Sequence, residues 1–151
     1  MAGGYYEDFQ VGDVIDSPES YEITPERLHQ FAAEFDPQPM HLDEAAAERS
    51  IFGRLVASGW QTLSVTMRLM VRSPLFESGE VVGVGVDDMR WIAPVEPGDK
   101  LRARAEILSK RESASRPNQG YMTVPETTRV GDKQVASMVV TMMVPRRPTS
   151  E

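Results

Sequence analysis

The chain has 151 residues, of which 40% are hydrophobic, and a formal net charge of −7 at pH 7. This length suits one domain with a sizeable core, and we expect a single domain over residues 1–151. The acidic balance argues against a dedicated nucleic-acid-binding protein. The absence of cysteine excludes disulfides and thiolate metal sites. The N-terminus has no signal-peptide pattern and no apolar run approaches membrane-spanning length, so we expect a cytoplasmic protein that does not bind membranes.

The first elements are a weak strand and an amphipathic helix. Residues 14–23 alternate poorly and Pro18 interrupts them, which favours an edge strand. The segment Thr24-Pro25-Glu26 is a helix start, with a cap, a proline and an acidic first turn. One apolar helix face follows, made of Leu28, Phe31, Ala32 and Phe35. His29 falls on the polar side, where a solvated side chain is expected.

A proline-stiffened loop comes next and carries two ionisable side chains, Asp36 and His41. A residue before proline is pushed out of the α region, so the helix should end at the Asp36-Pro37 step. The prolines, including Pro39, also fix the backbone of the loop. A carboxylate and an imidazole are the usual groups for moving protons near neutral pH. Beyond the loop, Asp43 is expected to cap a short helix that runs to about Arg49.

Ser58 begins a second helix pattern. Ser58 and Gln61 have capping-box spacing before an apolar run, and we expect the helix to end at Ser73-Pro74. The pattern is apolar on most faces, which predicts a buried helix. Gly59 has no side chain, so a ligand oxygen could approach the free amides at this helix start, where a developing negative charge is stabilised.

The second half of the chain is strand-like. Residues 81–86 and 101–107 alternate, and the glycines at 83 and 85 leave room for a helix or ligand to approach. Residues 121–130 and 134–144 flank the turn at residues 130–133 and predict a hairpin, in which Pro125 indicates an edge or a bulge. We expect Trp91 to lie in the core, residues 113–120 to form a polar loop, and residues 1–4 and 146–151 to be loose ends.

These motifs together resemble the MaoC-like dehydratases, the (R)-specific enoyl-CoA hydratases of the hot-dog superfamily. The resemblance runs over about residues 5 to 145. Its elements are Asp36, Pro39, His41 and Asp43, the alanines at 45–47, Phe52-Gly53, Ser58-Gly59, the segment 90–95 and Pro97-Gly98-Asp99. Two positions depart from the family pattern: Ser58 stands where a histidine is usual, and Met67 stands closest to a frequent helix serine.

The resemblance implies an α+β hot-dog fold, an antiparallel sheet wrapped around a long central helix. It implies hydration of a trans-2-enoyl thioester by Asp36 and His41, the dyad, with Gly59 N–H binding the thioester oxygen. Ser58, Trp60 and Pro39 are the expected substrate-binding residues. No metal or redox cofactor is expected, coenzyme A is part of the substrate, and the protein is expected to be at least a homodimer.

Other interpretations remain open. A hot-dog thioesterase is disfavoured because residues 59–72 contain no Asp or Glu. A non-catalytic acyl-thioester-binding subunit remains an alternative, given the departures at Ser58 and Met67. A metal site at Asp36, His41 and Asp43 is disfavoured because a single nitrogen ligand is a poor transition-metal set. Ser58 lacks the surroundings of a nucleophilic serine. The sequence leaves the acyl chain and its carrier, coenzyme A or acyl carrier protein, undetermined.

Overall fold

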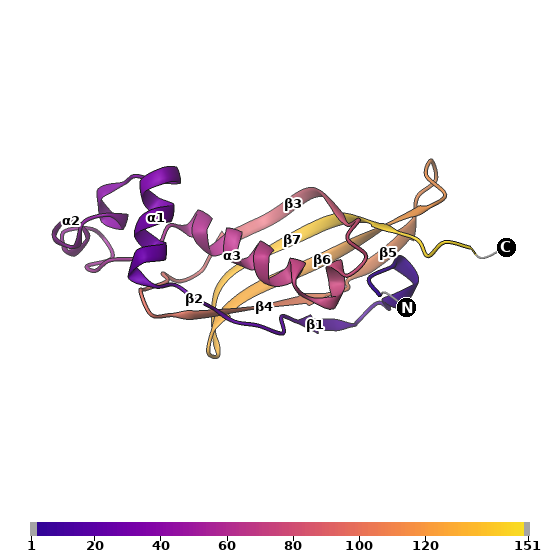
Figure 1. Ribbon diagram of the computed structural model, residues 1–151, viewed down its shortest axis with the longest axis horizontal. Coiled ribbons are helices and arrows are strands. Elements are labelled where there is room, and N and C mark those ends of the chain that lie inside the picture. Colours follow the sequence, from indigo (N-terminus) through magenta and orange to yellow (C-terminus); the bar gives the residue numbers. More distant parts are fainter. Residues whose placement is uncertain (1–2, 150–151) are drawn as a thin grey trace.

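A computed structural model describes residues 3–149, which form one antiparallel sheet packed against helix α3 (Figure 1). The main strand order is β1-β4-β6-β7-β3, with β2 also paired to β4 and β5 to β6. The strands are β1 (Val14–Asp16), β2 (Tyr21–Glu22), β3 (Val82–Trp91), β4 (Lys100–Glu106), β5 (Ser109–Glu112), β6 (Gln119–Val130) and β7 (Lys133–Pro145). The helices are α1 (Pro25–Phe35), α2 (Glu44–Glu48) and α3 (Gly59–Val71), with 3-10 turns η1 (Tyr6–Asp8), η2 (Pro39–His41) and η3 (Pro74–Phe76). The predicted α+β hot-dog architecture is confirmed.

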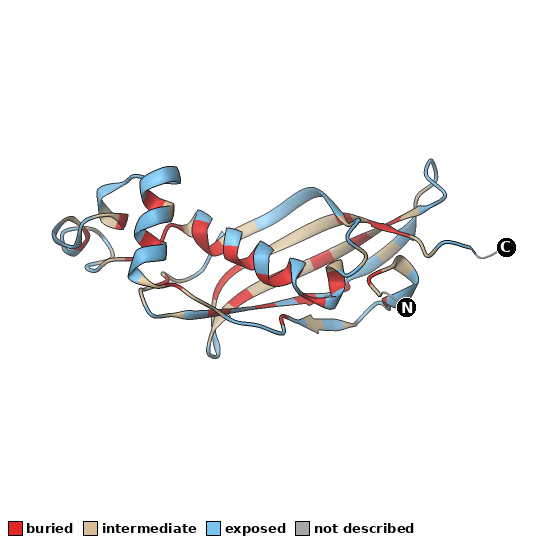
Figure 2. Cartoon of the chain, in the orientation of Figure 1, coloured by how far each residue is buried: buried red, intermediate tan, exposed pale blue. Residues whose placement is uncertain are grey.

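Helix α3 is buried on the side that faces the sheet (Figure 2). Val65, Leu69 and Met70 enter the core, and the hydroxyl of Thr66 hydrogen bonds to that of Thr128 on β6. The opposite side is open, and Met67 there is 51% exposed. The prediction that this helix is buried on most faces is therefore wrong for one face, which hydrophobic content alone could not reveal.

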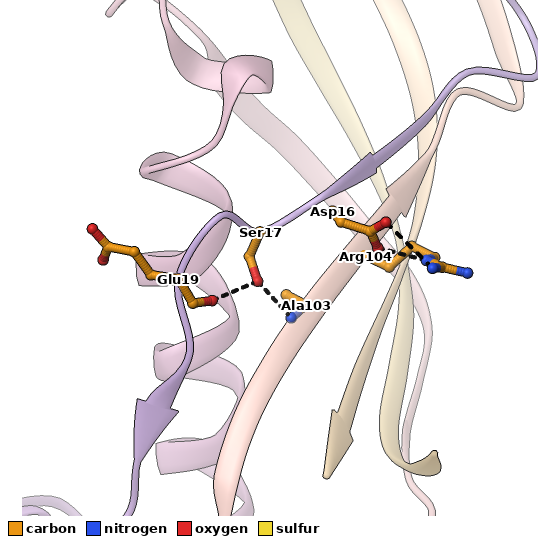
Figure 3. Close-up of polar contacts among 5 residues, drawn as sticks. All are labelled: Asp16, Ser17, Glu19, Ala103 and Arg104. Atoms are coloured by element: carbon orange, nitrogen blue, oxygen red, sulfur yellow. Dashed lines mark hydrogen bonds and ion pairs between the residues drawn. The ribbon is translucent and has the colours of Figure 1, made fainter. Parts of the chain in front are cut away.

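The weak strand predicted at residues 14–23 is two short strands on the edge of β4. Between them the buried Ser17 hydroxyl donates to the carbonyl of Glu19 at 2.9 Å and accepts from Ala103 N–H at 3.1 Å (Figure 3). Asp16 pairs with Arg104 beside this break. The serine side chain thus replaces backbone pairing where the edge strand is interrupted.

The predicted hairpin is confirmed, with β6 and β7 joined at Gly131, whose φ is +59°. Pro125 lies inside β6, which is a central strand, so the expected edge position is wrong. The expected irregularity is present: the pairing shifts by one residue, from Ala105 opposite Glu126 to Ser109 opposite Thr123, and the proline faces this gap between β4 and β5. A missing N–H is tolerated there because no continuous partner strand runs alongside.

Other sequence expectations differ from the structure in detail. Gly83 and Gly85 pair with β7, but a side-chain carbon added at either would meet no atom of the described residues within 4 Å, so no helix packs on that face of β3 at the glycines. Phe35, expected on the apolar face of α1, is exposed, while His29 is exposed as expected.

Both chain ends lie at the end of the sheet opposite α1 and α2 (Figure 1). Gly4 is buried and Arg146 pairs with Glu7 and Glu112, so these parts of the predicted loose ends are packed. Residues 1–2 and 150–151 of those predictions lie outside the described residues. Within residues 3–149 no helix has the length and apolar character needed to cross a membrane.

Candidate active site

The loop after α1 begins where the sequence predicts, at the Asp36-Pro37 step. Helix α1 ends at Asp36, whose N–H still donates to Ala32 O, and the chain then turns through η2. His41 closes that turn by donating its N–H to Gln38 O at 2.9 Å. Asp43 caps α2 through Ala46 N–H, as expected. We call residues 36–41 the dyad loop.

The imidazole of His41 is 4% exposed and held from both sides. Its Nδ1 lies 2.7 Å from the carbonyl oxygen of Val56, and its Nε2 lies 3.3 Å from Asp36 Oδ2. Because a carbonyl only accepts, Nδ1 carries a proton and donates it. In the neutral imidazole Nε2 is therefore a free acceptor that faces the carboxylate. A proton donor such as water beside the pair would be bound by two acceptors.

The carboxylate of Asp36 is partly exposed and has several partners. Gln38 Nε2 donates to Oδ1 at 2.7 Å. Partial burial acts to raise the pKa of Asp36, but hydrogen bonds from Gln38 and Ser58, together with the nearby His41, outweigh it and lower that pKa below its ordinary value. Asp36 is thus ionised at neutral pH and able to accept a proton or orient a water.

The start of α3 supplies free amides beside the dyad. The Ser58 hydroxyl accepts from Trp60 N–H at 3.2 Å, so the predicted cap is confirmed. The predicted capping box is wrong, because the Oε1 of Gln61 accepts no hydrogen bond from Ser58 N–H, while its Nε2 donates to Arg27 O at 3.0 Å. Within residues 3–149 Gly59 N–H makes no hydrogen bond, and it stands at the positive end of the helix.

A cavity of about 450 Å³ joins these groups. Its lining includes Asp36, His41, Gly59 and Trp60, four of the residues that the sequence singled out. Pro39 and Ser58 do not line it. Pro39 begins η2, and Ser58 is fully buried under the carboxylate of Asp36 and the first turn of α3. The structure therefore brings Ser58 to the dyad as a positioning group, not as a wall of the cavity.

Sequence reasoning missed three contributors to the cavity and its dyad. Gln38 lies between the two prolines, and its closeness to Asp36 was a usable signal. The Val56 carbonyl that orients His41 left no signal, because any residue type provides a carbonyl. Trp91 was predicted to lie in the core but is 47% exposed and lines the cavity with Trp60.

The described residues contain no group of three or more His, Cys, Asp or Glu side chains placed to hold a metal ion. The polar groups at the cavity include an acceptor pair, Asp36 and His41, and a free amide donor, Gly59 N–H. An acceptor pair can deprotonate water, and an amide donor can stabilise an oxyanion.

Residues 8–130 match the MaoC-like domain family, and the chain belongs to this family. It is 33% identical over 118 residues to the uncharacterised protein YdeM of Bacillus subtilis, covering 78% of this chain and 82% of that protein.

Solved structures give the same assignment. A MaoC-like dehydratase from Rhodospirillum rubrum superposes with a TM-score of 0.91 at 39% identity, over 97% of this chain and 100% of that one. Two more distant structures share the fold alone. An (R)-hydratase of Pseudomonas aeruginosa has a TM-score of 0.72 at 23% identity, over 100% and 94% of the two chains. A Mycobacterium tuberculosis protein described as a double hot-dog fold has a TM-score of 0.81 at 19% identity, over 99% of this chain and 46% of that one.

Proposed function

We propose that the protein is an (R)-specific enoyl-CoA hydratase, which adds water reversibly to a trans-2-enoyl thioester. The observation that carries the proposal is the convergence on one cavity of the Asp36–His41 acceptor pair, 3.3 Å apart, with the unpartnered Gly59 N–H. The similarity to a protein described as a MaoC-like dehydratase supports the same reaction class.

In the proposed reaction, a water lies in the cavity beside Asp36 Oδ2 and His41 Nε2 and donates a hydrogen bond to each. One of the pair removes a proton from the water as its oxygen bonds to C3 of the substrate. The double bond between C2 and C3 is lost, and its electrons move toward the thioester oxygen, where Gly59 N–H stabilises the negative charge. The proton taken from the water is then delivered by the dyad to C2, which completes the addition and returns the dyad to its starting state. The reverse steps dehydrate an (R)-3-hydroxyacyl thioester.

The remaining polar groups have positioning roles in this proposal. The Val56 carbonyl fixes the tautomer of His41, and Gln38 and Ser58 keep Asp36 ionised. Coenzyme A enters only as part of the substrate, and the proposed chemistry uses no metal or redox cofactor.

A panel of trans-2-enoyl-CoA thioesters of varied chain length tests the proposal. We expect loss of the conjugated absorbance without release of free thiol, and we expect the same from a His29→Ala variant, which changes the exposed histidine of α1. His41→Ala should remove the activity. Thiol release without hydration would support the thioesterase alternative, and binding without either reaction would support the acyl-binding subunit.

We further propose that the protein acts as a homodimer in the cytoplasm. Strand β3 pairs only with β7 within the described residues and exposes Val82, Val84 and Val86. An exposed apolar edge strand is a site for pairing with a second chain, and two-fold pairing is the common closed solution. Light scattering should give a dimer mass or a multiple of it. A stable monomer at micromolar concentration would contradict the proposal.

A further inference from the structure

Trp91 lies against the backbone that carries the free amide of the candidate site. A side-chain atom added at Gly59 would fall 2.5 Å from Cε2 and 2.8 Å from Cδ1 of Trp91, and closer still to Nε1. These near-equal separations place the five-membered ring of the indole flat over the Cα of Gly59. Only glycine fits beneath it, and the indole therefore packs against the residue that carries the free N–H.

Trp60 holds this arrangement from the other side. The two indole rings meet edge to face, with centroids 5.2 Å apart and an interplanar angle of 79°. Such pairs have a preferred geometry and resist rotation of either ring. Both rings remain about half exposed, at 55% for Trp60 and 47% for Trp91, and both line the cavity that contains the dyad.

An oxygen that accepts from Gly59 N–H lies about 2.9 Å from that nitrogen. Because this nitrogen is bonded to the Cα that the indole covers, the group bearing the oxygen must lie along the indole. A thioester conjugated to a double bond is planar, whereas the hydrated product is tetrahedral at C2 and C3. A flat group packs more closely on an aromatic face than a puckered one.

We propose that Trp91 is a substrate-contact residue that selects flat, conjugated acyl thioesters by packing its indole face on the enoyl thioester plane. This inference rests on the proposed function for the identity of the thioester, and it assigns Trp91 a role in discriminating enoyl groups from saturated ones. Trp60 is the positioning residue that keeps the indole of Trp91 in place.

Fluorescence gives a direct test, because the chain has only two tryptophans. In a Trp60→Phe/Asp36→Asn variant, Trp91 is the sole indole and turnover is suppressed. Titration with crotonyl-CoA should quench its emission saturably, and butanoyl-CoA, which differs only in lacking the double bond, should bind more weakly. Emission that is unchanged by both thioesters, or that changes only with protein concentration, would overturn the inference.

Kinetics of the turnover-competent protein give the second test. Trp91→Leu should raise KM for crotonyl-CoA by up to about tenfold, the size expected for losing one aromatic stack. It should change the inhibition constant of butanoyl-CoA much less, and Trp91→Phe, which keeps a flat ring, should restore most of the preference. General damage to the site would weaken both ligands equally, and that result would also overturn the inference.

The two proposals fail separately. If the wild type hydrates crotonyl-CoA but Trp91→Leu keeps the wild-type preference for crotonyl-CoA over butanoyl-CoA, the inference is wrong and the proposed function stands. If crotonyl-CoA quenches Trp91 but the wild type does not hydrate crotonyl-CoA, the proposed function is wrong and the contact with Trp91 stands. Absence of both binding and hydration removes both.

Discussion

The dyad loop and the central strand β6 each hold a carboxyl group, and the two groups differ in what surrounds them. Asp36 is partly exposed and receives hydrogen bonds from Gln38 and Ser58, beside His41. Glu126 of β6 is 4% exposed, and its carboxyl group makes no hydrogen bond or ion pair with residues 3–149. Its cross-strand neighbours are Ala105 and Met138.

The difference appears in the acidity of the two groups. Partial burial of Asp36 is outweighed by its partners, and its pKa is lowered, whereas burial raises the pKa of Glu126 to about 7. Burial alone favours the neutral acid, and hydrogen-bond donors favour the anion. Burial alone therefore does not identify a carboxylate that can act in catalysis. The arrangement of donors around Asp36 distinguishes the candidate site from a core position.

The largest expected effect is on turnover when the charge of Asp36 is removed. Asp36→Asn keeps the shape of the side chain and should lower kcat by about 10²–10⁴. His41→Ala should do the same, and the double variant should be little worse, because both groups act on one water. Rates of the four proteins on one enoyl-CoA check this, with Glu126→Gln as the carboxyl control that should keep near wild-type kcat. Near-full activity in both single variants would remove the chemistry from this loop.

The next effect is expected at Gly59. Gly59→Ala places a methyl group against the indole of Trp91 and should displace the ring and the amide that it flanks. Loss of such a donor lowers rates by about 10²–10³. Gly83→Ala on β3 is the matched control, because nothing lies within 4 Å of the added atom among the described residues. Turnover, melting temperature and tryptophan emission should change together only in Gly59→Ala.

Glu126 should affect stability and its dependence on pH. Below the ordinary pKa of 4.5 the carboxyl is neutral in both folded and unfolded chains, so its ionisation does not change the free energy of unfolding. Between 4.5 and about 7 only the unfolded chain ionises, so stability falls as pH rises, and above about 7 the full loss is present. Glu126→Gln should therefore stabilise the protein by up to about 3 kcal/mol at pH 8.

Denaturant unfolding at pH 4 and pH 8 measures this effect. The control is Glu106→Gln on the exposed end of β4, which should change neither value by much. A gain from Glu126→Gln that is equal at both pH values would show that ionisation is not its cause.

The smallest effect should come from removing one hydrogen-bond donor from the carboxylate of Asp36, which makes its surroundings more like those of Glu126. Ser58→Ala removes one donor to the carboxylate and the cap of α3. Loss of the cap should cost about 1 kcal/mol of stability. Loss of the donor should raise the pKa of Asp36 and move the acid limb of the pH–rate profile to higher pH. If the pH–rate profile does not move while stability falls, Ser58 caps α3 but does not affect the pKa of Asp36.

Local sequence signals predicted the elements whose causes are local. Thr24, Asp43 and Ser58 cap the helices that they were expected to cap, and the turn at Gly131 joins the expected hairpin. The hot-dog arrangement came from the family resemblance, since alternation alone does not give strand order.

Features that depend on distant residues were not predictable in this way. Gln61 has capping-box spacing, but its side-chain amide donates to the carbonyl of Arg27 on α1. Pro125 fits a central strand only because another strand is interrupted beside it. Trp91 is a residue type that is expected in a core, but its exposure depends on how β3 passes the start of α3.

The hydroxyl contact between Thr66 and Thr128 joins residues 62 positions apart and so has a consequence for biosynthesis. The ribosome completes α3 before it makes any of β4, β6 and β7, the strands that share the core with Val65, Leu69 and Met70. Contacts between distant segments form late and slowly in folding. The nascent chain therefore carries an uncovered apolar helix through translation of its second half, the interval in which chaperones and premature association compete for it.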